Sequence, residues 1–210
     1  MARSIHLFVS SSPELVPERE ALGQAVAELP VSTRWEIKHT PRTEEPSDES
    51  LAFIERCDLY LIVLGADFAA PMGLEWRLAL EMKRIRTIRK HVLAYRKQVL
   101  PSPSARALLR QSDVRWTEFQ SPQEFKTKVS RSLAQLMLDE SERFGLHMSE
   151  IEPLLALAEA EKSDKSDKGA ASLPSASWAG EQENPTEPDR RRGAGRGGVI
   201  LGRGTESRKT

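Results

Sequence analysis

The sequence predicts an α/β domain with a doubly wound, five-stranded parallel sheet, and two observations carry that prediction. The first is the apolar run at residues 59–64 between Asp58 and Gly65, which is typical of a strand buried on both faces of a parallel sheet. The second is the alternation of strand-like and helix-like segments from residue 4 to about residue 138. Such alternation indicates strand–helix–strand units joined by right-handed crossovers.

The first strand is expected at residues 4–10, where apolar residues lead into a run of serines. The helix that follows either begins with a capping box formed by Ser11 and Glu14 or opens at Pro17. The second strand, near residues 33–39, alternates apolar and charged residues. This alternation indicates a half-buried strand near an edge of the sheet.

A short helix around Leu51 and Ile54 precedes the central strand at residues 58–65. The next helix is expected to begin at Leu74, which places Glu75 in its first turn at the carboxyl edge of the sheet. Open parallel sheets bind ligands beyond this edge, so Glu75 is the first candidate for a functional group.

Three further elements complete the domain: a strand at residues 91–95, a helix opening at Ser102 and Pro103, and a strand at residues 114–119. The last helix begins with a capping box and ends near residue 138. We expect flavodoxin-like strand order, a three-layer sandwich, and eight buried apolar residues around the sheet. These are Leu7, Phe8, Leu61, Val63, Leu78, Met82, Val92 and Leu133.

The chain is expected to divide into three regions: the α/β domain at residues 1–140, a short helix at 141–162, and a disordered tail at 163–210. Ser149 and Glu152 form the expected capping box of the short helix, which ends near Lys162. The tail is rich in Arg, Gly, Ser and Pro. Its composition fits a solvated segment and also resembles RNA-binding tails.

Composition excludes several classes of protein. Equal numbers of basic and acidic residues, 31 of each, give no global field toward nucleic acid or anionic membranes. The single cysteine, Cys57, excludes an internal disulfide and a multi-cysteine zinc site, and the four histidines show no metal-ligand spacing. No apolar stretch approaches the roughly 20 residues of a membrane span, so a cytoplasmic protein is expected.

Ordered motifs along residues 4–138 resemble a TIR-like domain-of-unknown-function family, whose members usually stand at the N-terminus of bacterial STAND-type sensor proteins. The family opens with F-V-S-S-T-x-x-D-L-x-x-E-R. The matching residues in this chain are Phe8-Val9-Ser10-Ser11-Ser12, Leu15, Glu18-Arg19, Trp35-Glu36, Cys57-Asp58-Leu59-Tyr60, Leu64-Gly65 and Gly73-Leu74-Glu75-Trp76-Arg77-Leu78-Ala79.

The wider group to which this family is similar includes TIR domains and nucleoside deoxyribosyltransferases. In its active members a glutamate on the helix after the central strand serves cleavage of an N-glycosidic bond. The resemblance implies this role for Glu75, because a carboxylate can stabilise or trap the developing oxocarbenium ion. A merely structural role at the start of the helix remains the alternative.

The first loop supplies a second set of candidates. Ser10, Ser11 and Ser12 present hydroxyls and backbone amides as a weak anion site, or else only cap the helix. If a ligand binds, these serines should converge with Glu36, Asp67 and Glu75 on one concave site. No cofactor and no metal are expected.

Three functions remain open from sequence. The first is a TIR-like signalling or defence module that docks protein partners, self-associates or senses a nucleotide. The second is an N-glycosidase that cleaves NAD or a nucleoside through Glu75. The third is nucleic-acid binding through the Arg/Gly tail, which the balanced charge of the chain disfavours.

Overall fold

The structure is a computed structural model that describes residues 4–41, 46–85 and 89–160. The strands are β1 (Ser4–Ser11), β2 (Arg34–His39), β3 (Leu59–Leu64), β4 (His91–Lys97) and β5 (Trp116–Phe119). The helices are α1 (Val16–Ala27), α2 (Asp48–Arg56), α3 (Ala70–Arg84), α4 (Pro103–Gln111), α5 (Pro122–Asp139), α6 (Ser141–Phe144) and α7 (Met148–Glu159). The tail expected at residues 163–210 lies outside the described residues.

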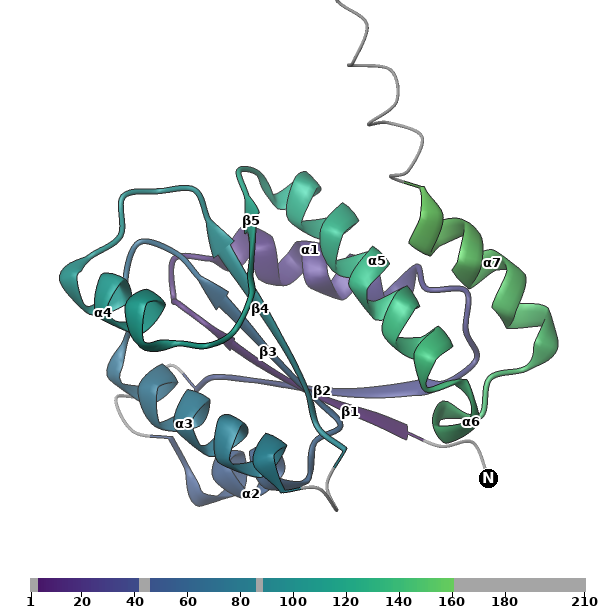
Figure 1. The fold of residues 1–210 in the computed structure, drawn as a ribbon, viewed down its shortest axis with the longest axis horizontal. Helices are drawn as coiled ribbons and strands as arrows, with labels where there is room; N and C mark the ends of the chain where they lie inside the picture. The colour runs from purple at the N-terminus through teal and green to yellow at the C-terminus, as the bar shows by residue number, and fades with distance from the viewer. Residues whose placement is uncertain (1–3, 42–45, 86–88, 161–210) are drawn as a thin grey trace, which may run out of the picture. The chain divides into compact units, whose positions relative to one another are not determined.

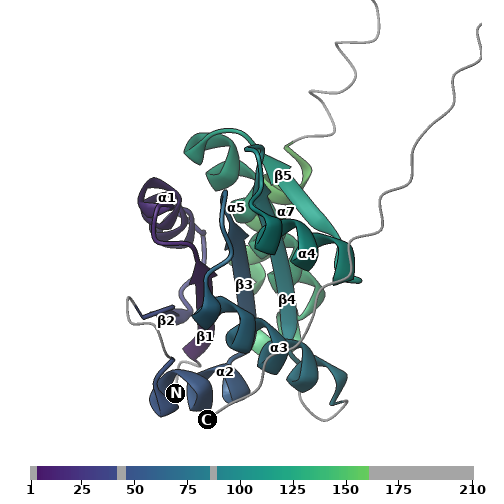
Figure 2. The ribbon, with the colours of Figure 1, turned by 90° about the vertical axis from the view of Figure 1, so that its left-hand side faces the viewer.

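The five strands form one parallel sheet in the order β2-β1-β3-β4-β5, which Figure 2 shows from β2 across to β5. This is the flavodoxin-like order, so the predicted fold class is confirmed. Leu61 pairs with Val9 on one side and Leu93 on the other, which places β3 at the centre of the sheet. The half-buried strand β2 lies at an edge, as its alternating sequence predicts.

Helices cover both faces of the sheet (Figure 1). We call the face under α1, α5 and α7 the first face; its core is largely aliphatic and includes Leu7, Leu61 and Leu133. The second face lies under α2, α3 and α4 and is rich in aromatic rings. Because successive strand residues point to opposite faces, Phe8 and Tyr60 belong to the second face, and their rings stack 5.9 Å apart.

Five of the eight predicted core residues are buried, whereas Leu78, Met82 and Val92 are only partly buried. All three lie on the second face or on the helix that covers it. Leu78 and Val92 pack against the core of this face without being enclosed by it, and Met82 lies in the last turn of α3. The prediction of full burial was therefore wrong for these three side chains.

Of the two alternatives predicted for the start of α1, the opening at Pro17 is confirmed: Pro17 lies in the first turn, and no side-chain hydrogen bond caps the helix, so the capping box of Ser11 and Glu14 is not formed. The predicted start of the short C-terminal helix needs correction. Helix α7 begins with a capping box of His147 and Glu150, and not of Ser149 and Glu152. The capping box of His147 and Glu150 is favoured by a tertiary contact that the local sequence does not reveal.

That contact joins α7 to the turn after α1. The Glu150 carboxylate accepts hydrogen bonds from the backbone amide and hydroxyl of Ser32, at 2.6 and 2.7 Å. It also accepts one from the amide of His147 at 2.7 Å. Leu154 is fully buried in the core of the first face, so α7 packs as part of the same body as the sheet.

Helix α3 also begins earlier than expected, at Ala70 and not at Leu74. Its cap is Ala69, which makes no side-chain hydrogen bond, and Pro71 occupies the first turn. Glu75 therefore lies in the second turn of α3. The expected position of Glu75 in the first turn was therefore wrong, and the helix dipole, which acts mainly within that turn, contributes little at Glu75.

Candidate functional site

A buried polar cluster lies where β1 and β2 end and α3 passes over the second face. Glu75 of α3 is fully buried, and both Ser10 and Thr40 donate hydrogen bonds to its Oε2 atom at 2.7 Å. The two hydroxyl oxygens are 3.3 Å apart. We call Ser10, Thr40, Tyr60 and Glu75 the Glu75 cluster.

Backbone pairing fixes the positions of the two hydroxyls. Ser10 lies opposite Ile62 in the β1–β3 ladder, on the second face. The amide of Thr40 donates to the carbonyl of Val9 at 3.0 Å, which extends the β1–β2 pairing by one residue beyond β2. Both hydroxyls are thereby presented to the helix above by rigid strands rather than by free loops.

Burial dominates the electrostatics of the cluster. It raises the pKa of Glu75, and the hydrogen bonds from Ser10 and Thr40 oppose that rise only in part. The other carboxyl oxygen, Oε1, and the Tyr60 hydroxyl are both buried, and neither has a hydrogen-bond partner among the described residues. Burial and the neighbouring Glu75 charge raise the pKa of Tyr60 well above its usual value. The site therefore stabilises the protonated form of Glu75 relative to its ionised form more than water does.

The other two serines of the first loop, Ser11 and Ser12, make hydrogen bonds to residues other than Glu75. The Ser11 hydroxyl accepts a hydrogen bond from Nη1 of Arg19 at 3.2 Å, and the same nitrogen donates to the carbonyl of Ser12 at 3.1 Å. The Ser12 hydroxyl donates to the carbonyl of Asp67 at 2.8 Å. Both serine side chains are buried, so their hydroxyls hold the loops together and do not face solvent.

The two remaining candidates lie apart from Glu75. The Asp67 carboxylate accepts hydrogen bonds from the hydroxyls of Ser102 and Ser104 at 2.7 and 2.9 Å, which tie its loop to the start of α4. The bond from Ser102 is the main cause of its lowered pKa. Glu36 lies within β2, opposite His6, and its carboxylate pairs with that ring at 3.2 Å. Only Ser10 of the predicted set touches Glu75.

Sequence reasoning missed two members of the Glu75 cluster, Thr40 and Tyr60. Thr40 follows directly after an expected strand, and parallel strands end at a common edge, so its position was an available signal. Tyr60 was assigned to the strand only as an apolar residue. The structure places its hydroxyl near the buried Glu75, whose charge contributes to the raised pKa of Tyr60.

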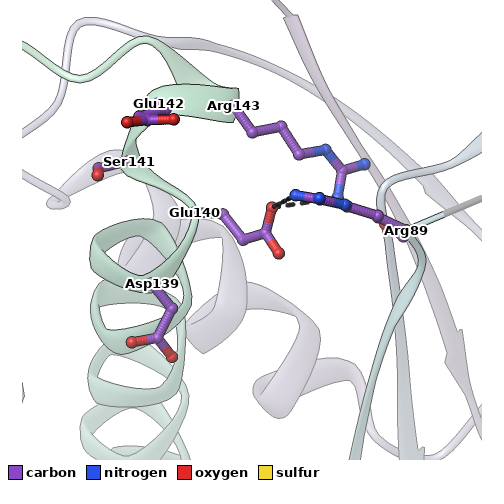
Figure 3. Close-up of a pocket in the computed structure, with 6 residues that line it drawn as sticks. All are labelled: Arg89, Asp139, Glu140, Ser141, Glu142 and Arg143. Carbon is purple, nitrogen blue, oxygen red and sulfur yellow. Dashed lines mark hydrogen bonds and ion pairs between the residues drawn. The ribbon is translucent and has the colours of Figure 1, made fainter.

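A second polar region lies at the opposite, amino edge of the sheet. It is a depression of about 500 Å³ lined by Arg89, Asp139, Glu140, Ser141, Glu142 and Arg143 (Figure 3). The Glu140 carboxylate points at Arg89, 3.5 Å away, and Arg143 donates to Asp58 at 2.6 Å. These charges pair with one another, which indicates a structural role for this edge.

Among residues 4–41, 46–85 and 89–160, no group of three or more His, Cys, Asp or Glu side chains is arranged to hold a metal ion. No helix in these ranges is long and apolar enough to cross a lipid bilayer.

Comparisons with known proteins give similarity to solved structures only. Neither the models of known protein families nor the curated proteins give a match. One similar structure is the RPS4 and RRS1 TIR domain heterodimer, at 14% identity and a TM-score of 0.44, over 63% of this chain and 97% of that chain. Another is a flavodoxin, WrbA-like protein from Agrobacterium tumefaciens, at 10% identity and a TM-score of 0.35, over 79% and 100%. The flavodoxin-like fold itself follows from the strand order.

Proposed function

We propose that this chain is a TIR-like module that acts in signalling or defence by contacting protein partners or a second copy of itself. The ordered motifs over residues 4–138 support the TIR-like assignment, and the flavodoxin-like sheet is compatible with it. One observation carries the choice of an interaction module over an enzyme: Glu75, the acid on which catalysis would depend, is fully buried.

A carboxylate that attacks or stabilises a ribosyl carbon must come within contact distance of the substrate. Here Oε2 of Glu75 is occupied by the hydroxyls of Ser10 and Thr40. Burial also raises the pKa of Glu75 and so opposes the ionised form that a nucleophile requires. These features suit a structural acid inside a binding module.

Exposed apolar side chains offer a surface for a partner. Leu100 and Val99, which follow β4, are 89% and 40% exposed. Val16 at the start of α1 and Leu74 near the start of α3 are also exposed. All four belong to segments that follow the carboxyl ends of strands, and we call them the carboxyl-edge apolar residues. Exposed apolar groups at one edge are typical of interaction sites.

Sedimentation of the full chain over a range of concentrations tests self-association. We expect concentration-dependent dimers or larger species, and Leu100→Asp should weaken them at least tenfold in Kd, because it places a charge at the proposed contact. Met148→Asp is the matched control, since Met148 is 83% exposed on α7 and should leave association unchanged. A chain that is monomeric at all concentrations leaves only contacts with other proteins, and pull-down with the same two variants then decides between them.

An N-glycosidase acting on NAD or a nucleoside is the second candidate. The unpartnered Oε1 atom of Glu75 favours it, because one carboxyl oxygen remains uncommitted. The test is incubation of the purified chain with NAD, with nicotinamide release as the readout. If the wild type releases nicotinamide and Glu75→Gln lowers that release by a factor of about a hundred or more, the result would overturn the interaction module in favour of the N-glycosidase. Ser11→Ala and Asp67→Asn are controls that should change turnover less.

A further inference from the structure

The single cysteine of the chain lies against a buried lysine. Cys57 caps the C-terminus of α2 and is 1% exposed, and Lys90 directly precedes β4 and is 4% exposed. The Nζ atom of Lys90 is 3.0 Å from Sγ of Cys57. Two groups that can each be oxidised are therefore in contact and shielded from bulk water.

Other contacts hold the lysine at this position. Nζ also donates to the backbone carbonyls of Ile54 at 2.5 Å and Cys57 at 2.7 Å, at the negative end of α2. No carboxylate pairs with Lys90 in the described part of the chain. With its three donors directed at two carbonyls and the thiol, the amine cannot turn away from Sγ without losing hydrogen bonds.

We propose that oxidation joins Cys57 and Lys90 covalently through an oxygen atom inserted between Sγ and Nζ. The Lys90 ammonium first gives up one proton to water. With a peroxide as oxidant, one thiol and the resulting neutral amine then react with two molecules of hydrogen peroxide to give the S–O–N bridge and three molecules of water. Sulfur and nitrogen each lose two electrons, and each peroxide gains two. One peroxide oxygen remains in the bridge, and the thiol hydrogen and one amine hydrogen leave in water.

The geometry favours the bridge over two other oxidation products. A direct sulfur–nitrogen bond would require the two atoms to approach much more closely than their 3.0 Å separation, whereas an inserted oxygen requires a smaller approach. Further oxidation of Cys57 to the sulfinic acid would add a second oxygen to sulfur at a position that is 1% exposed. A sulfenic acid formed at Sγ has the lysine amine as its immediate neighbour.

Burial sets the rate of this reaction. It raises the pKa of the Cys57 thiol, and the charge of Lys90 only partly opposes that rise. Because the thiolate is the nucleophile toward peroxide, oxidation should be slow at neutral pH and faster at higher pH. The bridge would therefore report sustained oxidant exposure and not a brief pulse.

The bridge would also change the fold mechanically. Cys57 and Lys90 lie on either side of the segment that carries β3 and α3, so a covalent link closes this segment into a loop. Loop closure restricts the unfolded chain and stabilises the native state. We expect the melting temperature of the oxidised protein to rise by several degrees and to return on reduction.

Intact mass and peptide mapping of the full chain after peroxide treatment test the proposal. The bridge adds one oxygen and removes two hydrogens, a gain of about 14 Da, against about 16 Da for a sulfenic acid and 32 Da for a sulfinic acid. Trypsin should release one crosslinked species joining peptide 57–77 to peptide 90–96, with no cleavage after Lys90. Dithiothreitol should restore both peptides.

Two variants complete the test. Cys57→Ser removes the sulfur, and Lys90→Arg keeps a cation beside the carbonyls but removes the primary amine; neither should give the crosslinked peptide. Gains of 16 or 32 Da on Cys57 with normal cleavage after Lys90 would overturn the proposal. So would a wild-type thiol that stays unmodified in the folded protein at pH 9, or a gain of 14 Da that persists in Lys90→Arg.

Discussion

Both faces of the sheet are packed under helices, but their cores differ in amino-acid composition. The first face is built mainly from Leu, Val and Ala, with Phe119 and Phe125 at one end. The second face has a chain of aromatic contacts that runs from Phe8 through Tyr60 and Trp76 to Trp116. The first face is closed by long helices, whereas the second is covered in part by the short helix α4.

The faces also differ in how they bury charge. Glu18 of α1, on the first face, is 1% exposed and pairs with Lys97 at 2.9 Å. Glu75, on the second face, has hydroxyl partners but no cation within ion-pair distance in the described ranges. An ion pair offsets part of the cost of burying a charge, whereas burial without a cation raises the pKa of Glu75. The second face therefore contains a buried acid whose protonation is shifted by burial.

Leu61→Asp should disrupt the core of the first face and unfold the domain. Leu61 is fully buried at the centre of the sheet, and an unpaired carboxylate there costs several kcal/mol, a large share of the stability of a small domain. We expect the variant to be unfolded by circular dichroism and urea titration. Leu155→Asp, at a 45% exposed position on α7, is the control and should change stability by about 0.5 kcal/mol or less. A cooperatively folding Leu61→Asp protein would contradict the central position of β3.

Two methionine truncations compare the covers of the two faces. Met137 of α5 is fully buried on the first face, and Met82 of α3 is only partly buried on the second. Met137→Ala should lower the free energy of unfolding by about 2–5 kcal/mol, the range for a buried methionine. Met82→Ala should lower it by about 1 kcal/mol. Both sites are helical, so the change in helix propensity cancels; equal losses in urea denaturation would show that the faces do not differ.

Glu75→Gln should make the protein less sensitive to pH. The folded protein holds the Glu75 proton more tightly than the unfolded chain, whose pKa is near 4.5, because burial raises the folded pKa. In the wild type this contribution is fully present below pH 4.5 and is lost as pH rises through the folded pKa. The glutamine of the variant does not titrate, so the variant does not lose stability in this way. Its free energy of unfolding relative to that of the wild type should therefore increase with pH.

Urea titrations of both proteins from pH 4 to pH 9 measure this difference. Carboxylates with lowered pKa values, such as Asp67 and Glu118, change stability in the opposite direction but equally in both proteins. A constant difference between the two curves would show that Glu75 titrates normally and is not an unpaired buried acid.

Removing one hydroxyl from each face gives the smallest effect. Tyr60→Phe deletes a buried hydroxyl with no described partner and should be neutral or stabilise by up to about 1 kcal/mol. Tyr95→Phe, on the first face, deletes a hydroxyl that donates to the carbonyl of Lys128 at 3.5 Å and should destabilise by about 0.5 kcal/mol. Thermal melts of the pair resolve the sign, and a destabilising Tyr60→Phe would mean that its hydroxyl has a partner, such as an ordered water.

Patterns that depend on period and burial were readable from the sequence. The apolar run of β3, the alternation of β2 and the capping signal at the start of α5 each predict their element correctly. The start of α3 was misplaced because Ala69 gives no capping signal. The candidate site was only partly readable, since the contact of Thr40 with Glu75 joins residues 35 positions apart. Such contacts depend on the crossover geometry and not on local pattern.

The attachment of Glu150 to Ser32 has a consequence for the order in which the chain assembles during synthesis. All five strands are made before α7, yet the hydrogen bonds at Ser32 and the burial of Leu154 await a helix that begins at Met148. Until then the nascent chain exposes part of the first face. Incomplete apolar surfaces of this kind are where growing chains associate wrongly. Helix α7 therefore acts as a closing step of folding, at a stage when all the described strands have been made.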